Sequence, residues 1–258
     1  MRGGAVIDGY SHCGISKYLP VEDVLETMRA AGVARAVLCQ QLGEYDNSYL
    51  ESVVAEHPDT FRAVCLVDPG PGDWRGALHS THASRRFRGL RVVAATLLEN
   101  PALCAEALAL GLTLVVWAEH GVTDIVAPLR ELCADHPDGR IVITHLGAPR
   151  VENGAIVAGW ELLELADEPG VFVTLSGQSM LCDYPYNELN ELVVRVIDAF
   201  GTGKVMWGSN YPVCGDAEAY RRDLTQLMSG GWGLGSREVE QIAHDTAAQL
   251  WFDEAAPA

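Results

Sequence analysis

Short apolar runs rich in β-branched residues alternate along the chain with longer segments whose apolar residues recur at helical spacing. The strand-like runs fall near residues 5–12, 34–41, 62–68, 89–94, 112–118, 140–147, 171–177 and 204–212. Helical patterns lie near 20–31, 47–56, 73–86, 101–109, 123–135, 155–167, 186–200 and 216–229, and a ninth runs from Ser236, at its cap position, to Phe252. Eight strands alternating with eight helices predict an α/β fold, a (β/α)8 TIM barrel with an extra C-terminal helix. No linker or change of composition divides residues 1–258, so we expect one domain.

The first strand-like run ends in an unusually polar tip, Asp8-Gly-Tyr-Ser-His12. Side chains alternate across a strand, so Asp8, Tyr10 and His12 are expected to share one face. Polar groups are costly to bury without partners, which indicates that this face serves a site. On that face Asp8 could orient Tyr10 or fix the tautomer of a neighbouring histidine.

Further polar residues follow the other apolar runs. In a parallel barrel the carboxyl ends of the strands meet at one mouth, where active sites lie. The residues predicted at that mouth are Tyr10 and His12, Arg91, Trp117 and Glu119, His145, and Asn210. Their origin in five different strands favours an enzyme.

Composition limits the alternatives. A net charge of −17 repels phosphate backbones, which argues against nucleic acid as a partner and leaves a small-molecule substrate. No run of about 18 apolar residues is present, so we expect no membrane span, and no secretory signal is visible. Seven cysteines without a Cys-x-x-Cys pair suit a reducing cytoplasm. The sequence is compatible with a homo-oligomer but does not define an oligomeric state.

Several motifs together resemble those of the amidohydrolase-related family, the barrel hydrolases, lactonases and decarboxylases of the amidohydrolase superfamily. The matching segments are Ile7-Asp8 followed by His12, Tyr45-Asp-Asn-Ser-Tyr49, Gly89-Leu-Arg91, His145-Leu-Gly147, Leu175-Ser-Gly177 and Gly208-Ser-Asn-Tyr-Pro212. They occur in the family's order and cover nearly the whole chain. The resemblance implies a barrel enzyme in which His145 is an acid–base residue.

The same resemblance implies a metal site that this chain has altered. The family's first strand reads Asp-x-His-x-His, and here Tyr10 replaces the first of those histidines. Trp117 stands where strand 5 often carries a ligand histidine, and Asn210 replaces the aspartate of the strand-8 motif. A phenol, an indole and an amide do not assemble a zinc site, so we expect no metal and no other cofactor. Some lactonases of the family work without metal.

The remaining groups predict acid–base chemistry on a small ring compound. His12 and His145 can transfer protons near neutral pH, Tyr10 can act as an acid or donor, and Asn210 can donate to an oxyanion. Expected substrate-binding residues are Trp117 as a stacking wall, Glu119, and the arginines Arg91 and Arg150 (with Arg88 a further candidate) as carboxylate clamps. The leading hypothesis is lactonase-type opening of a carboxylated or conjugated ring, or its reverse.

Three alternatives stay open. A biosynthetic cyclase or isomerase would use the same groups without adding water. A metal-dependent decarboxylase or hydrolase would need displaced ligands such as His12, Glu119, His120 and a loop cysteine. A binding barrel without turnover would also tolerate the lost ligand positions. Cys13, Cys182 and Cys214 follow neighbouring strands and could supply a thiolate, although free cysteine more often fills space.

Overall fold

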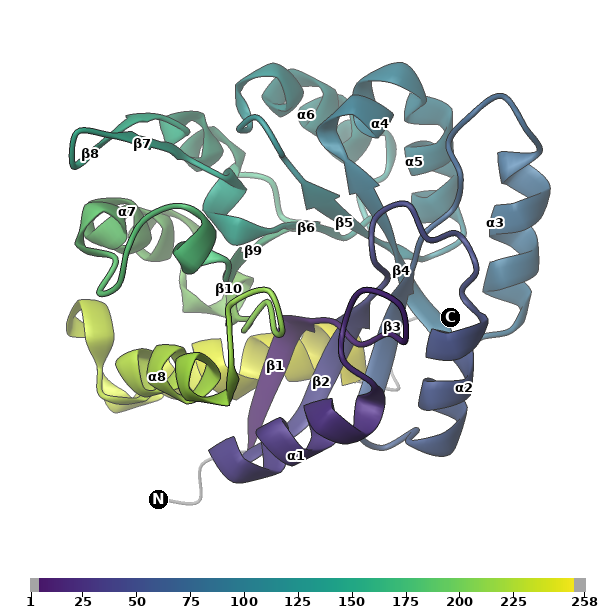
Figure 1. The fold of residues 1–258 in the computed structure, drawn as a ribbon. Helices are drawn as coiled ribbons and strands as arrows, with labels where there is room; N and C mark the ends of the chain where they lie inside the picture. The colour runs from purple at the N-terminus through teal and green to yellow at the C-terminus, as the bar shows by residue number, and fades with distance from the viewer. Residues whose placement is uncertain (1–4, 253–258) are drawn as a thin grey trace.

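The computed structural model describes residues 5–252, and its centre is an eight-stranded parallel sheet (Figure 1). Its strands are β1 (Val6–Ser11), β2 (Val33–Cys39), β3 (Phe61–Cys65), β4 (Phe87–Val93), β5 (Thr113–Trp117), β6 (Ile141–Ile143), β9 (Val171–Leu175) and β10 (Val205–Trp207). Each pairs in parallel with the next around the sheet. Their nearly continuous apolar runs suit strands that are buried on both faces. The predicted (β/α)8 barrel is confirmed.

The first and last strands meet just beyond their carboxyl ends. The amide of Asn210 donates to the carbonyl of Tyr10, and the amide of His12 donates to the carbonyl of Tyr211, both at 2.8 Å. Gly208 permits this approach, because a Cβ at that position would lie 2.8 Å from the Cβ of Tyr10. These bonds bring His12 and Asn210 to the same mouth of the barrel.

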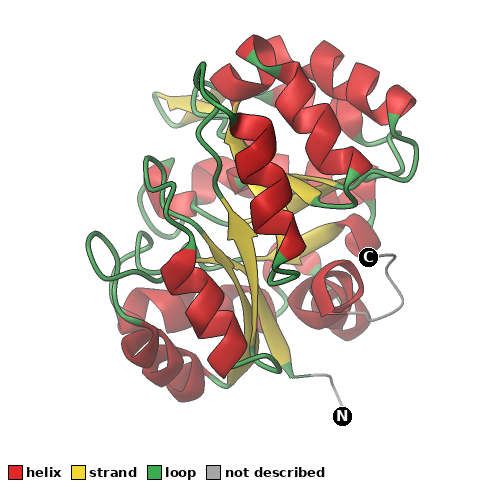
Figure 2. Ribbon diagram, turned by 90° about the vertical axis from the view of Figure 1, so that its right-hand side faces the viewer, coloured by secondary structure: helices red, strands yellow, loops and turns green. Residues whose placement is uncertain are grey.

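Helices cover the outside of the strands, as the two perpendicular views show (Figures 1 and 2). They are α1 (Val21–Ala31), α2 (Ser48–Glu56), α3 (Trp74–Ala83), α4 (Ala94–Glu99), α5 (Pro101–Ala109), α6 (Val126–Asp135), α7 (Asn190–Phe200) and α8 (Ala217–Met228). The apolar sides of these helices and the outward residues of the strands form the larger core. None of the helices within residues 5–252 combines the length and apolarity needed to cross a membrane.

A second, smaller core lies inside the barrel. Helix α9 (Ser236–Glu240) continues through two π-helical segments, Gln241–Asp245 and Ala248–Phe252. Figure 1 shows this segment, in yellow, crossing behind β1 and β2. Its last residues pack against the inward side chains of the strands, in a cluster of Ile7, Tyr10, Val37, Cys39, Val64, Val115, Val142, Met206, Ala247, Leu250, Trp251 and Phe252. The extra C-terminal helix therefore fills the end of the barrel opposite the predicted mouth.

Some predicted elements were wrong in detail. The expected helix at 155–167 is instead a hairpin of β7 (Arg150–Glu152) and β8 (Ala155–Ala158), followed by a 3-10 helix at Trp160–Leu165. The backbone at Gly154 and Gly159 has positive φ, which ends any helix there. Helix α4 was not expected, and the last helix is capped by Gly235 rather than Ser236.

Candidate active site

Side chains from distant parts of the sequence converge at the carboxyl ends of the strands. Tyr10 lies in β1 and Arg91 in β4. His12 and Tyr18 follow β1, His145 follows β6, and Asn210 follows β10. All except Tyr18 are nearly inaccessible to solvent. The structure thus brings together the four predicted catalytic residues and one predicted substrate-binding residue, Arg91.

Tyr10 lies at the centre of this cluster. Its ring meets the rings of His12 and His145 edge-on, with centroids 5.1 and 5.0 Å away, and the Arg91 guanidinium lies 5.8 Å from its centroid. Its hydroxyl is buried and has no hydrogen-bond partner among the described residues. Burial raises the pKa of Tyr10, and the positive charge of Arg91 only partly opposes this. The phenol is therefore protonated and is free to donate a hydrogen bond to a substrate.

The hydrogen bonds of His12 define its tautomer. Nδ1 lies 2.7 Å from the carbonyl oxygen of Cys39, so Nδ1 carries the proton. Burial and the charge of Arg91 lower the pKa of His12 to about 3, which leaves Nε2 unprotonated. Nε2 lies 3.2 Å from Asn210 Oδ1, and two acceptors cannot bond. Since amide oxygen and nitrogen have nearly the same shape, we orient the Asn210 amide with Nδ2 donating to His12.

His145 is held by the strand beside it. Its Nδ1 lies 2.8 Å from Ser176 Oγ, and its backbone amide donates to Thr174 Oγ1 at 3.2 Å. A Cβ on Gly177 would lie 2.5 Å from His145 Nδ1, so only glycine fits there. His145 has φ of 56°, and left-handed backbone at non-glycine residues is concentrated at functional sites. Burial, then the charge of Arg91, lower the pKa of His145 to about 3, so this imidazole is also neutral.

Arg91 places a buried positive charge beside these neutral groups. Nη1 donates to the carbonyl of Gln40 at 2.6 Å, and the guanidinium also bonds the Tyr18 hydroxyl. Nε is buried without a partner, and within residues 5–252 no carboxylate forms an ion pair with Arg91. Buried charges are normally paired, so this guanidinium creates a site that favours negative charge.

Asp8 does not face the cluster, which corrects the expectation that it shares a face with Tyr10 and His12. The strand pairing is irregular between Asp8 and Ser11, so the simple alternation fails there. The carboxylate of Asp8 instead accepts bonds from the Ser209 amide at 2.8 Å, the Ser209 hydroxyl at 2.6 Å and the Tyr220 hydroxyl at 3.0 Å. It accepts a fourth, from the Tyr10 amide, at 3.3 Å. Burial nevertheless raises its pKa to about 6. Asp8 joins β1 to β10 and touches neither histidine.

Three predicted substrate-binding residues lie outside this network. Trp117, at the end of β5, is half-buried and makes no ring contact with the cluster among the described residues. Glu119 accepts bonds from the amides of Ala94 at 2.9 Å and Ala95 at 3.5 Å, so it caps α4. Arg150, 67 % exposed, pairs with Glu152 on the hairpin at 3.2 Å.

Arg88, the further clamp candidate, is also misplaced, since it lines a cavity beside the C-terminal helix. That cavity is at the amino-terminal end of the barrel. The clamp of several arginines is therefore wrong, and Arg91 alone remains.

The cysteines do not supply a nucleophile. Burial is the main cause that raises the pKa of Cys13 to about 12 and of Cys182 to about 11, and it raises that of Cys214 further. A nucleophilic cysteine needs a lowered pKa. These thiols act as small apolar side chains.

The donor set at the barrel mouth does not fit a metal ion. No group of three or more histidine, cysteine, aspartate or glutamate side chains within the described part of the chain is arranged to hold one. The displaced ligands that the metal-dependent alternative needs are not gathered here, since Glu119 is bound to backbone amides and His120 is exposed. What remains are two neutral imidazoles, which are too few ligands for zinc.

Tyr18 and Met180 were missed by the sequence analysis. The Tyr18 ring stacks on His12 at 4.6 Å, and Met180 Sδ lies 3.1 Å from the side-chain amide of Asn210. Tyr18 follows the exposed Ile15, in the loop between β1 and α1, and Met180 follows β9. The only sequence feature that could have identified them is their position in loops at the catalytic end of a barrel. Together they cover the cluster.

A (β/α)8 barrel with histidines, a tyrosine and an arginine gathered at the carboxyl ends of its strands has the architecture of a barrel hydrolase. The chain belongs to the amidohydrolase family, whose model matches residues 12–252, as the motifs predicted.

Individual relatives fit the same picture. A Burkholderia ambifaria protein named L-fucono-1,5-lactonase is 27 % identical over 208 residues, which are 74 % of this chain and 69 % of that protein. The structure of a candidate 2-pyrone-4,6-dicarboxylic acid hydrolase from Pseudomonas putida has a TM-score of 0.76 and 23 % identity, covering 95 % of this chain and 97 % of that one. An amidohydrolase from Burkholderia multivorans with bound zinc has a TM-score of 0.72 and 18 % identity, over 98 % and 100 % of the two chains.

Proposed function

We propose that this chain is a hydrolase that opens a small cyclic ester with its own acid–base side chains and without a bound metal ion. The observation that carries the proposal is the hydroxyl of Tyr10, which has no hydrogen-bond partner among the described residues. Its ring lies between two neutral imidazoles and beside a guanidinium that forms no ion pair within residues 5–252. Two relatives support the substrate class, since one is named a lactonase and the other is described as a candidate hydrolase of a 2-pyrone, and both rings are cyclic esters.

The substrate carbonyl would take the place beside Tyr10. The phenol donates its O–H to the carbonyl oxygen, and the positive charge of Arg91 stabilises the negative charge that develops there. Both effects are strong because the surroundings are buried and their dielectric constant is low. Tyr10 acts as a donor rather than a base, in keeping with its raised pKa.

His145 would act as the general base. Its Nδ1 is engaged by Ser176, while its Nε2 forms no hydrogen bond among the described residues. Nε2 takes a proton from water as the water oxygen bonds to the carbonyl carbon. The ring C–O bond then breaks, and the imidazolium returns the proton to the leaving oxygen, which yields a hydroxy acid. Negative charge forming nearby raises the pKa of the imidazole in the transition state, so the proton transfer becomes favourable.

The favoured substrate carries a carboxylate or gains negative charge on opening. Arg91 is nearly inaccessible to solvent and has no carboxylate of the described chain beside it, so an anionic group is the partner that it lacks. Trp117 is still predicted to stack against the substrate ring. Entry requires that Tyr18 or Met180 move away from His12 and Asn210.

A panel of cyclic esters tests the function. Purified chain is incubated with sugar-acid δ-lactones and with 2-pyrone carboxylates, and ring opening is followed by proton release or by loss of pyrone absorbance. We expect turnover that survives dialysis against EDTA and disappears in His145→Ala but not in His120→Ala, an exposed histidine of the β5 loop. Loss of activity in EDTA, with recovery on adding zinc, would overturn the metal-free mechanism.

One observation favours a second candidate, an isomerase or cyclase. The cluster is covered by Tyr18 and Met180, and such cover excludes water from a reaction that needs only proton transfer. Reaction in ¹⁸O-labelled water separates the two. A hydrolase places labelled oxygen in the new carboxylate, whereas an isomerase or cyclase leaves the product unlabelled.

A further inference from the structure

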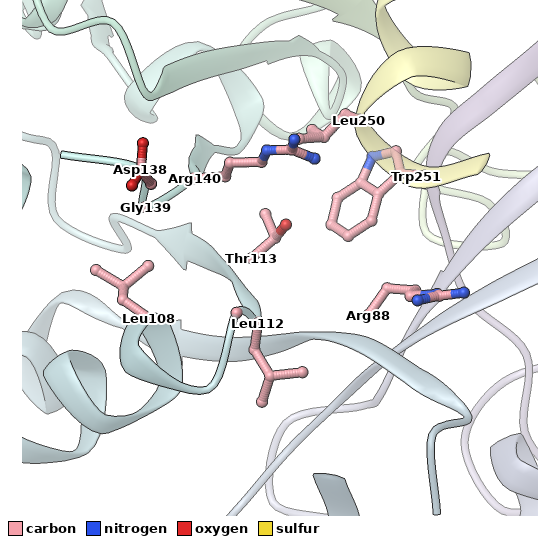
Figure 3. Close-up of a pocket in the computed structure, with 10 residues that line it drawn as sticks. Arg88, Leu108, Leu112, Thr113, Asp138, Gly139, Arg140, Leu250 and Trp251 are labelled. Carbon is pink, nitrogen blue, oxygen red and sulfur yellow. The ribbon is translucent and has the colours of Figure 1, made fainter. Parts of the chain in front are cut away.

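A small cavity lies at the end of the barrel opposite the candidate active site. It encloses about 80 Å³ between the starts of β4, β5 and β6 and the end of the C-terminal helix. That space holds roughly two or three water molecules or one tetrahedral oxyanion. Figure 3 shows the indole of Trp251 between the side chains of Arg140 and Arg88, with Thr113 beside it.

Three side chains that line this cavity, those of Thr113, Arg88 and Arg140, carry donors that bond no described residue. The indole N–H of Trp251 has no partner among the described residues, but its nitrogen is buried too deeply to be reached from the cavity. The Thr113 hydroxyl forms no hydrogen bond within residues 5–252. Buried polar groups are nearly always bonded, so the unpartnered hydroxyl of Thr113, in a side chain that is only 4 % exposed, indicates a ligand or an ion that completes the site.

The two arginines beside this donor are also unusual. Neither Arg88 nor Arg140 forms an ion pair with any described residue, although the chain carries 35 acidic residues and a net charge of −17. Arg140 is half-buried at the start of β6. Asp138, exposed at the outer edge, is the one acidic side chain among the residues that line the cavity. The cavity is thus lined by two positive side chains, of which Arg88 is exposed, and by one negative one.

We propose that this cavity, lined by Arg88, Arg140, Thr113 and Trp251, binds a small oxyanion of phosphate size, either free or as the terminal group of a larger metabolite. The guanidinium groups supply charge-assisted hydrogen bonds, which are the strong ones for such anions. The Thr113 hydroxyl supplies a neutral donor, and the Trp251 indole forms an apolar wall. The site is separate from the proposed ester hydrolysis, because it lies at the other end of the barrel.

Isothermal titration calorimetry of the full chain with inorganic phosphate tests the proposal. We expect saturable binding of one phosphate, weakened about tenfold in Arg140→Gln, since one charge-assisted bond is lost. Thr113→Val keeps the shape of the side chain and removes its hydroxyl, and we expect it to bind several-fold more weakly. Arg150→Gln is the matched control, because this exposed arginine lies on the hairpin, and its affinity stays that of the wild type. A parallel titration with glycerol phosphate shows whether the free ion or an esterified group fits better.

Three results would overturn the inference. The first is the absence of saturable binding in a wild-type chain that melts cooperatively. The second is equal loss in Arg140→Gln and Arg150→Gln, which would mark general charge attraction. The third is binding only after Asp253→Asn and Glu254→Gln, because the cavity would then belong to the chain's own carboxylates.

Discussion

Tyr10→Phe is expected to make the protein more stable and less active at the same time. The substitution removes one buried oxygen and keeps the ring that packs edge-on against His12 and His145. In the free protein that oxygen has no partner among the described residues. Its only proposed use is as a donor to substrate.

The magnitude follows from the cost of an unsatisfied buried group. Leaving a buried hydroxyl unpaired costs about 1–3 kcal/mol, and replacing it by an apolar group of the same shape removes this cost. For a chain of this size each kcal/mol corresponds to about 2–4 °C, so we expect Tyr10→Phe to raise Tm by roughly 2–12 °C. Loss of a positioned proton donor lowers kcat by about 10²–10⁴-fold.

Thermal unfolding followed by circular dichroism measures the first effect, and initial rates on the best ester measure the second. Tyr220→Phe is the matched control, since the same atom is removed from a buried tyrosine whose hydroxyl donates to Asp8 at 3.0 Å. There a real hydrogen bond to a carboxylate is lost, so Tm should fall by several degrees. A Tyr10→Phe protein that melts below the wild type would refute the reasoning, because the hydroxyl would then have a stabilising partner.

Other perturbations separate structural from catalytic roles. Burial raises the pKa of Asp8 to about 6, so its stabilising effect is complete below its ordinary pKa and is lost as pH rises through 6. The free energy of unfolding should therefore fall by about 2 kcal/mol from this group between pH 4 and 6, and urea unfolding of Asp8→Asn should lack that part of the pH dependence. Glu119→Ala removes the cap of α4 and should cost about 1 kcal/mol with kcat unchanged; a large fall in kcat would restore its predicted role in binding substrate. Ser176→Ala should lower kcat several-fold by releasing His145, with KM nearly constant, and a change confined to KM would contradict the positioning role.

The fold could be predicted from the sequence because its signal is repeated. Eight apolar runs at regular intervals require one closed parallel sheet, and small errors at their ends do not change that result. The hydrophobic pattern mispredicted some local elements where the backbone conformation decides the structure. The left-handed backbone at His145 ends the sixth strand early, and the glycines at 154 and 159 turn an expected helix into a hairpin.

The candidate site was predictable in its centre and not at its edges. Tyr10, His12, His145 and Asn210 stand directly at strand ends, where register leaves little freedom. Glu119 was misassigned because its partners are the amides that begin α4, a six-residue helix too short for a periodic signal.

Arg150 and Tyr18 lie in loops, so their positions depend on tertiary contacts that alternation does not encode. Arg150 forms an ion pair with Glu152 on the exposed hairpin, and the ring of Tyr18 stacks on the imidazole of His12.

The C-terminal helix has a consequence for how this chain is made. Its residues Leu250, Trp251 and Phe252 complete the inner core together with Ile7, which lies in the first strand. A ribosome therefore releases all eight barrel strands, with their apolar interior, before the segment that covers that interior has been synthesised. Nascent chains should depend on chaperones until residue 252 emerges, and a stop codon even a few residues earlier should yield an aggregating protein rather than a weakened enzyme.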